Sequence, residues 1–261
     1  MLVEREAVKI NFSDAAVTYN SWAQPQKKIA ARLIRLLPDN ISFDKILDLG
    51  CGTGNLIEQI LRQNSSVSIT GVDIAPGMIN YCINKWKDVS FVDFFVDDIE
   101  QIGLNLKYNL IMSSCVLQWI QNFDNLLSNL NNILSPGGHI AFAIPIDGSF
   151  YELRNSYDSI CSESSFGLKY SSSEFYLDLI RKHNFQIKTL SIETEYGFFK
   201  GLNVLKYFKK IGATFQHTHS YEPLHISEMH KLIEFYESTY KLDNGLLPVT
   251  HKILYLIAEK N

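Results

Sequence analysis

Short apolar runs alternate with stretches of helical periodicity between Lys45 and Ile144. This alternation is typical of βαβ units, in which parallel strands are joined by helices that pack on one sheet. The apolar runs predict strands at 45–49, 67–72, 91–96, 109–113 and 138–144. The intervening stretches predict helices at 54–63, 76–86 and 122–134, the last closed by the Ser-Pro-Gly-Gly of residues 135–138. The sequence therefore predicts an α/β fold with a mostly parallel central sheet and helices on both faces.

Two regions outside this core are expected to be helical. Residues 8–37 precede the first strand, and the polar, Ser-rich residues 145–183 follow the fifth. Because ligands of open α/β sheets bind at the carboxyl ends of the strands, we expect an N-terminal lid (8–37) and a substrate-covering insertion (145–183) there. The rest of the pattern predicts strands near 186–195 and 249–258 and helices near 200–211 and 227–240. We expect a single domain, 1–261, with a binding core at 45–144 and a C-terminal part of the sheet at 184–261.

Composition and charge narrow the class of protein. The 261 residues are 46% hydrophobic and 12% aromatic, as in globular proteins, and no stretch approaches the roughly 18 apolar residues of a membrane span. The first six residues carry acids where a secretory signal needs a basic and then an apolar segment. A net charge of −4 argues against general nucleic-acid binding, and four dispersed cysteines suggest neither a metal site nor disulfides. We expect a cytoplasmic monomer without metal, membrane or nucleic-acid partners.

The most informative chemical pattern follows the first predicted strand, where Asp48 is succeeded by Gly50, Cys51, Gly52 and Gly54. The spacing is G-x-G-x-G, whereas proteins that bind dinucleotides carry G-x-G-x-x-G. A carboxylate at the strand end repels a pyrophosphate but suits an ammonium group. The ligand should therefore carry a cation and no phosphate, and S-adenosylmethionine, with its α-amino group, sulfonium and adenosine, fits. The alternative is an ordinary glycine-rich turn with a helix-capping Asp.

Acidic residues also end the next two predicted strands. Asp73 can accept hydrogen bonds from both hydroxyls of a ribose. Asp98, or alternatively Asp97, can read an adenine together with a neighbouring backbone N–H, although a solvated acidic loop would look the same. Ile74 and Met78 are placed either to sandwich the adenine or to pack a helix on the sheet. The expected cofactor contacts are Asp48, Gly50, Cys51, Gly52, Gly54, Asp73, Ile74, Met78, Asp98, Ile99 and Ser114.

The loop after the fourth strand, residues 112–119, should face the transferable methyl group and so separates classes of methyl acceptor. It has no Asn/Asp-Pro-Pro-Tyr motif to hold an amino group, and no Pro-Cys nucleophile for cytosine. It has no carboxylates that would hold a metal for catechol chemistry. Such a neutral, partly apolar loop suits an acceptor that is already ionised at neutral pH, as a carboxylate is.

With Asp48 to Gly54, Asp73 and Asp98-Ile99, the chain resembles the S-adenosylmethionine-dependent class I methyltransferases of Rossmann-like fold. More narrowly, it is similar to the malonyl-acyl-carrier-protein O-methyltransferases of bacterial biotin synthesis. The matching segments are residues 12–19, 116–119, 148–153, 205–214 and 247–251. Two departures are His251, where that family usually has Tyr, and Ser114-Cys115, where Asn-Leu is more typical. The resemblance implies this class I fold, with an antiparallel last strand.

The resemblance also implies a reaction, the transfer of a methyl group to the free carboxylate of malonyl on acyl carrier protein. Esterification removes a charge and makes the malonyl unit similar to an ordinary fatty-acid primer. Two alternatives stay open. A methyltransferase for a free small acid, of the aconitate type, would share the fold and the Trp119 loop, and a non-catalytic module would bind the cofactor without transferring its methyl group.

The resemblance directs attention to three residues at the acceptor side. Tyr19 is expected to donate a hydrogen bond to a carboxylate oxygen, or else to be a packing residue of the lid. Trp119 is expected to form an apolar wall or to be buried in the core. Arg154 is the candidate to bind the malonyl carboxylate, with a solvated surface Arg as the alternative. Lysines of the predicted helix 200–212 are expected either to dock the acidic carrier protein or to form a solvated face: Lys200, Lys206, Lys209 and Lys210.

Overall fold

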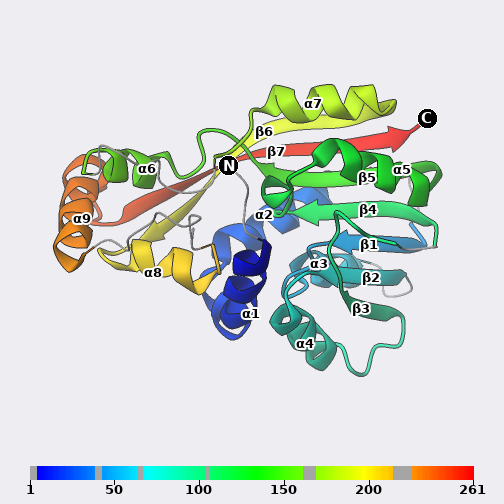
Figure 1. The fold of residues 1–261 in the computed structure, drawn as a ribbon, viewed down its shortest axis with the longest axis horizontal. Coiled ribbons are helices and arrows are strands. Elements are labelled where there is room, and N and C mark those ends of the chain that lie inside the picture. Colours follow the sequence, from blue (N-terminus) through cyan, green and yellow to red (C-terminus); the bar gives the residue numbers. More distant parts are fainter. Residues whose placement is uncertain (1–4, 39–42, 64–66, 104–105, 161–168, 214–224) are drawn as a thin grey trace.

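One seven-stranded sheet organises the chain in the computed structural model (Figure 1), which describes residues 5–38, 43–63, 67–103, 106–160, 169–213 and 225–261. The strands are β1 (Lys45–Leu49), β2 (Ser68–Asp73), β3 (Val92–Val96), β4 (Tyr108–Ser114), β5 (Leu134–Pro145), β6 (Phe185–Phe199) and β7 (Leu247–Lys260). Their order is β3-β2-β1-β4-β5-β7-β6, and all neighbours from β3 to β5 are parallel. β7 is antiparallel to both β5 and β6. The predicted fold class, including its antiparallel last strand, is confirmed.

The strand order reverses between β1 and β4, which are adjacent although β2 and β3 lie between them in sequence. At such a point the connections leave the sheet in opposite directions and open a crevice at the carboxyl ends of the strands. Asp48 pairs with Met112 close to this edge. Topology alone therefore brings the glycine loop and the loop after β4 to the same place.

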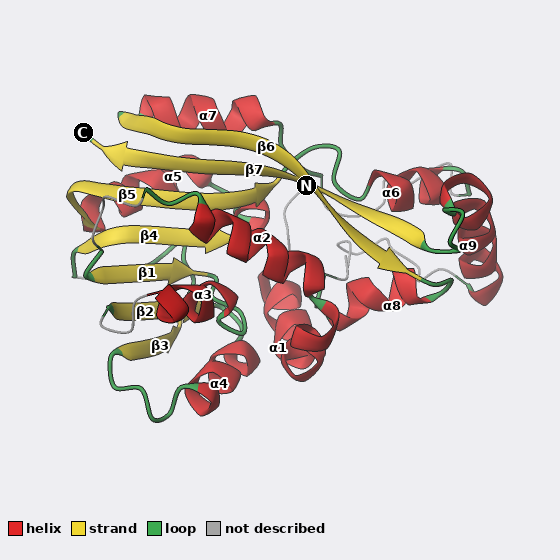
Figure 2. Ribbon diagram, turned by 180° about the vertical axis from the view of Figure 1, so that it is seen from behind, coloured by secondary structure: helices red, strands yellow, loops and turns green. Residues whose placement is uncertain are grey.

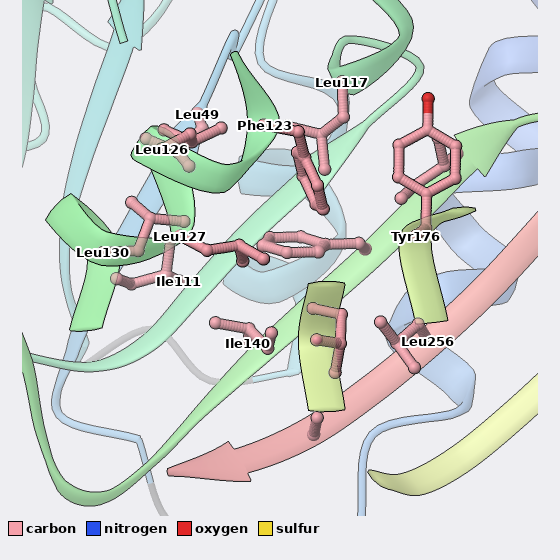
Figure 3. Packing of buried hydrophobic residues seen from close by; sticks show 14 of the residues in the cluster. Leu49, Ile111, Leu117, Phe123, Leu126, Leu127, Leu130, Ile140, Tyr176 and Leu256 are labelled. Carbon is pink, nitrogen blue, oxygen red and sulfur yellow. The ribbon is translucent and has the colours of Figure 1, made fainter. Parts of the chain in front are cut away.

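Helices cover both faces of the sheet because alternate strand residues point to opposite faces. On one face, α2 (Gln24–Arg35), α3 (Asn55–Gln63) and α4 (Pro76–Lys85) pack on residues such as Ile46 and Leu110. On the other, α5 (Phe123–Ile133) and α7 (Ser173–Lys182) pack on Leu47, Ile111 and Leu256. Figure 3 shows Phe123 and Tyr176 in this second core, and their ring centroids lie 5.1 Å apart.

The start of β5 differs from the prediction. The Ser-Pro-Gly-Gly of residues 135–138 was expected to separate a helix from a strand, but β5 begins at Leu134 and includes these residues. The pairing of β4 with β5 shifts here, since Tyr108 pairs with Leu134 whereas Leu110 pairs with His139. The breaker residues therefore form an irregularity within the strand, where the extra residues interrupt the ladder without ending it.

β6 and β7 are longer than predicted and extend past the other strands into a second part of the molecule (Figure 2). Their pairing continues to Phe199 and Leu247, because two antiparallel partners satisfy each other's backbone groups beyond the edge of the sheet. The end of this ribbon lies beside α6 (Tyr151–Asp158), α8 (Asn203–Lys210) and α9 (Ile226–Tyr240). We call α6, α8, α9 and the ribbon end the distal lobe.

The two regions expected to cover the strand ends are each divided. α1 (Arg5–Trp22) lies against α4 and α8, whereas α2 is part of the sheet packing. In the segment 145–183, α6 belongs to the distal lobe, but α7 packs on the sheet because its apolar stripe is buried there. Residues 161–168 of that segment lie outside the described residues. Among the described helices of these two regions, only α1 and α6 therefore lie away from the faces of the sheet.

Candidate active site

A cavity lies at the carboxyl ends of β1, β2 and β4, beneath α1. The structure brings most of the predicted site residues together in its lining: Tyr19, Asp48, Gly50, Cys51, Gly52, Asp73, Ile74, Met78, Asp98, Ile99, Ser114 and Trp119. The predicted residues that do not line it are Gly54, Arg154, Lys206, Lys209 and Lys210. Asp97, the alternative to Asp98, is exposed and outside the lining.

The three glycines of the loop have positive φ angles of 66°, 54° and 75°, which side chains rarely adopt. They differ in what a side chain would meet. A Cβ atom on Gly54 would lie 2.3 Å from the indole of Trp86, whereas a Cβ on Gly52 would meet no protein atom within 4 Å. Gly54 therefore allows Trp86 to pack beneath the loop, and Gly52 leaves open space for a ligand.

Asp48 is the most unusual group in the cavity. Its side chain is 1% exposed, and neither carboxylate oxygen has a hydrogen-bond partner. Burial, reinforced by the charge of Asp73, raises the pKa of Asp48 well above its ordinary value. A buried carboxylate without a partner is unfavourable, and a bound cation removes the penalty. The site thus fits the amino group of S-adenosylmethionine.

Asp73 fixes the glycine loop to the end of β2. Its two oxygens accept hydrogen bonds from the backbone N–H groups of Gly52 and Ala75, each at 2.8 Å. Burial raises the pKa of Asp73 to about 6, although these backbone hydrogen bonds oppose the rise. Each carboxylate oxygen has a second lone pair, so the group can still accept from ribose hydroxyls.

The first turn of α1 is attached to the loop after β3, the predicted adenine side of the cavity. Arg5 Nη1 lies 2.8 Å from Asp98 Oδ2, and Arg5 Nη2 lies 2.7 Å from Glu100 Oε2. Glu100 also accepts hydrogen bonds from the backbone N–H groups of Gln121 and Asn122. Arg5 thereby joins α1 to two connecting loops of the sheet. Arg5 and Glu100 carried no motif in the sequence, because ion pairs between residues about 95 positions apart leave no local pattern.

α1 also contacts the glycine loop directly. Asn20 accepts a hydrogen bond from the Thr53 hydroxyl and donates one to Tyr81 on α4, both at 2.8 Å. Ser13 accepts from the backbone N–H of Gly77, and a Cβ atom on that glycine would lie 2.4 Å from the Ser13 carbonyl oxygen. Gly77 thus lets α1 approach α4 closely and cover the cavity.

The acceptor side of the cavity is aromatic and uncharged. Tyr19 is partly buried, and within the described part of the chain its hydroxyl makes no hydrogen bond. Trp119 packs edge-on against Phe12 of α1, with 5.8 Å between ring centroids. Burial raises the pKa of the Cys115 thiol to about 12, so this thiol is protonated at neutral pH. The lining residues include no histidine.

The remaining predicted residues lie in the distal lobe. Arg154 on α6 is partly buried and close enough to the buried Tyr170 for its charge to lower the pKa of that phenol, against the larger effect of burial. On α8, Lys206 and Lys209 are exposed and Lys210 is partly buried. Thr214, the last residue of the matching block 205–214, lies outside the described residues.

The described residues contain neither a metal-binding cluster nor a membrane-spanning helix. No three or more His, Cys, Asp or Glu side chains there are grouped to hold a metal ion. No helix in the described ranges is both long and apolar enough to cross a membrane.

Comparison with known proteins gives consistent results. Residues 19–190 match the family model described as a methyltransferase domain. The chain is 31% identical to malonyl-[acyl-carrier protein] O-methyltransferase 2 of Ilyobacter polytropus, and the match covers 100% of both chains. It is 31% identical to malonyl-[acyl-carrier protein] O-methyltransferase of Acetivibrio thermocellus, over 99% of this chain and 95% of that protein.

Solved structures show the same fold at low identity. The YcgJ protein from Bacillus subtilis superposes with a TM-score of 0.61 at 12% identity, covering 89% of this chain and 98% of that one. Geranyl diphosphate C-methyltransferase from Streptomyces coelicolor, solved with Mg²⁺, geranyl diphosphate and S-adenosyl-L-homocysteine, gives a TM-score of 0.54 at 14% identity, covering 89% and 78%.

Proposed function

This chain belongs to the malonyl-[acyl-carrier protein] O-methyltransferases, and we propose that it transfers a methyl group from S-adenosylmethionine to the free carboxylate of malonyl-acyl carrier protein. The donor is supported by one observation above all, the buried carboxylate of Asp48 with two unpartnered oxygens in the cavity. The acceptor is supported by similarity over the full length to relatives that bear this name. Esterification would neutralise the free carboxylate of the malonyl unit, which could then prime the synthesis of pimeloyl, a biotin precursor.

The residues around the cavity suit the binding of the donor. Asp48 would hold the amino group, Asp73 would hold the ribose, and Asp98 with the backbone N–H of Ile99 would lie beside the adenine. The bound donor supplies a methyl group on a sulfonium, which needs no further activation. The protein then has to align donor and acceptor and to exclude water, since the attraction between sulfonium and carboxylate is stronger in a dry cavity. α1, held by Arg5 and Asn20, covers the cavity for this purpose.

The acceptor side supports a carboxylate as nucleophile. A carboxylate is ionised at neutral pH and needs no base. The lining offers neither a histidine nor a reactive thiol for this role, because the pKa of the Cys115 thiol is about 12; its carboxyl groups belong to the proposed donor half or, in Glu100, pair with Arg5. A carbon or amine acceptor would require a group that takes a proton. Tyr19 lines the cavity, and its hydroxyl, which has no protein partner among the described residues, would donate a hydrogen bond to the acceptor carboxylate.

Arg154 is the proposed anchor of the malonyl unit on the side of the distal lobe. It lies on α6, beside Tyr170, and Tyr170 in turn is close enough to Cys115 for their charges to interact. Arg154 itself is outside the lining of the cavity. Its guanidinium would pair with a carboxylate that enters from this side.

The carrier protein would dock on α8. This helix buries Val204, Tyr207 and Phe208, which leaves Lys206 and Lys209 exposed and Lys210 at the margin. None of the three lysines forms an ion pair with a described residue. Lys200 is exposed just before the helix. Acyl carrier proteins are strongly acidic, and a basic helix packed against α1, which covers the cavity, complements that charge.

Transfer of label from methyl-labelled S-adenosylmethionine tests the function. The purified protein is incubated with malonyl-acyl carrier protein, with free malonate or aconitate, or without an acceptor. We expect base-labile label on the carrier protein alone. Label on the free acids would favour the small-acid methyltransferase, and binding of the donor without transfer to any acceptor would favour the non-catalytic module.

A further inference from the structure

A buried chain of three polar side chains ends at the cavity. Gln26 on α2 donates a hydrogen bond from Nε2 to the hydroxyl of Tyr207 on α8, at 2.7 Å. That hydroxyl lies 3.1 Å from Nε2 of His251 on β7. The three side chains are 7%, 0% and 1% exposed, and Gln26 alone lines the cavity. The chain therefore leads from the interior of the distal lobe to the cofactor site.

The protonation state of His251 determines the direction of these hydrogen bonds. Burial lowers the pKa of His251 to about 3, so the ring is neutral at neutral pH and can accept a hydrogen bond at Nε2. The Tyr207 hydroxyl then donates a hydrogen bond to His251 Nε2 and accepts one from Gln26 Nε2. The amide of Gln26 is held with Nε2 toward Tyr207, which turns its carbonyl oxygen, Oε1, the other way.

Gln26 Oε1 is buried and has no hydrogen-bond partner. A buried acceptor without a donor is unfavourable, and a ligand with N–H groups would satisfy it. Asp48, whose two oxygens also lack a hydrogen-bond partner, lines the same cavity as Gln26. An ammonium group has three N–H donors and can bind a carboxylate and an amide carbonyl together.

We propose that Gln26 binds the α-amino group of S-adenosylmethionine beside Asp48, and that Tyr207 and His251 are positioning residues that hold its amide with Oε1 toward the cavity. The inference rests on the proposed function, because it assumes the same donor. It assigns to the distal lobe a part in binding the cofactor as well as the acceptor.

Calorimetric binding of three ligands to the full chain tests this assignment. The ligands are S-adenosylhomocysteine, its decarboxylated form, which keeps the amino group, and its deaminated form, which keeps the carboxylate. The variant Gln26→Met retains the length of the side chain but lacks the carbonyl. We expect about 10- to 100-fold weaker binding of the two ligands with an amino group, the range for a hydrogen bond to a charged group. Binding of the deaminated ligand should be unchanged.

Tyr207→Phe separates positioning from direct contact. It removes the hydroxyl that orients Gln26 and should weaken binding of the same two ligands by about three- to tenfold, the usual range for one hydrogen bond. Added to Gln26→Met, it should cause no further loss, because the two residues act through one contact. Tyr236→Phe is the matched control, since Tyr236 is also a fully buried tyrosine of the distal lobe but donates to the Pro248 carbonyl. It should bind all three ligands normally.

Two outcomes would overturn the inference. Equal loss for all three ligands in a Gln26→Met protein with unchanged thermal unfolding would mean that Gln26 does not distinguish the amino group. Loss for S-adenosylhomocysteine and its deaminated form, with unchanged binding of the decarboxylated form, would assign Gln26 to the carboxylate instead. If the unmodified chain bound none of the ligands, the proposed function would fail as well.

Discussion

The two halves of the proposed site are built in different ways. The donor half takes its polar groups from the carboxyl ends of β1 and β2 and from the loop after β3, and one of its acidic residues, Asp48, is buried without a partner. The acceptor half combines aromatic residues of α1 and the loop after β4 with a distal lobe whose helix α8 carries exposed lysines. A ligand common to many reactions can be bound by one continuous motif, whereas a particular acceptor needs surfaces from distant segments. The following changes test that difference.

The largest effect is expected within the glycine loop itself. Gly54→Ala should lower the free energy of unfolding by about 2–5 kcal/mol, because the residue has a positive φ and its Cβ would overlap Trp86. Gly52→Ala, with the same strain but no neighbour, should cost about 1–2 kcal/mol and weaken donor binding about tenfold. Chemical denaturation and calorimetry measure the two quantities. Equal stabilities of the two variants would show that Trp86 adapts easily.

Asp48→Asn should weaken binding of S-adenosylhomocysteine by about 100-fold, through loss of a charge-assisted contact to the amino group. The ligand-free variant should be at least as stable as the unmodified protein at neutral pH, since it no longer buries an unpaired charge. Calorimetry and thermal unfolding test the two halves of this prediction. A variant that bound normally would remove the main support for the donor.

Reversal of charge on α8 should act on the acceptor half alone. Lys206→Glu with Lys209→Glu should raise KM for malonyl-acyl carrier protein about 10- to 30-fold and leave donor binding unchanged, because like charges then oppose the acidic carrier. Lys45→Glu with Lys87→Glu makes the same change in net charge at two exposed lysines outside the distal lobe and serves as control. Similar losses in both double variants would point to net charge instead of docking.

Tyr19→Phe should reduce kcat/KM for the carrier-bound substrate about tenfold with little effect on donor affinity, if its hydroxyl binds the acceptor. Tyr81→Phe is the comparison, because it removes a hydroxyl that joins α1 to α4 without lining the cavity. Steady-state kinetics with varied acceptor separates them. A Tyr19→Phe enzyme with unchanged kinetics would make this residue part of the lid packing only.

The smallest effect is a dependence of donor binding on pH. The pKa of Asp73 is about 6 in the ligand-free protein, and a bound cation favours the ionised form, so binding should release protons. Through Asp73, affinity should be up to about twofold weaker at pH 6 than at pH 8. The free energy of unfolding depends on pH in the opposite direction. The raised pKa of Asp73 stabilises the native state fully below about pH 4, and this contribution is lost as the pH rises through 6. Calorimetry in buffers of different ionisation enthalpy measures the protons released, and Asp73→Asn should abolish that part of the release.

The sequence by itself determined the fold class and most of the donor half. Alternating apolar runs dictate strands and helices, and residues at the end of a strand reach the ligand edge of a parallel sheet wherever the strand lies. Asp48, Asp73 and Asp98 were therefore found from their positions after three strands, and the cavity contains all of them. Gly54 shows the limit of such a motif, because its role in packing depends on Trp86, which is 32 positions later in the chain.

Only the tertiary structure decided the rest. The ion pairs of Arg5, the length of the β6–β7 ribbon and the division of residues 145–183 between the distal lobe and the sheet all depend on partners far away in sequence. The contact of Gln26 with Tyr207 joins residues 181 positions apart. Periodicity records which face of an element is buried, but it does not record what lies against that face. Local spacing in the sequence was sufficient to predict the residues of the donor half. The surfaces of the acceptor half could be located only from the packing of segments that are remote in sequence.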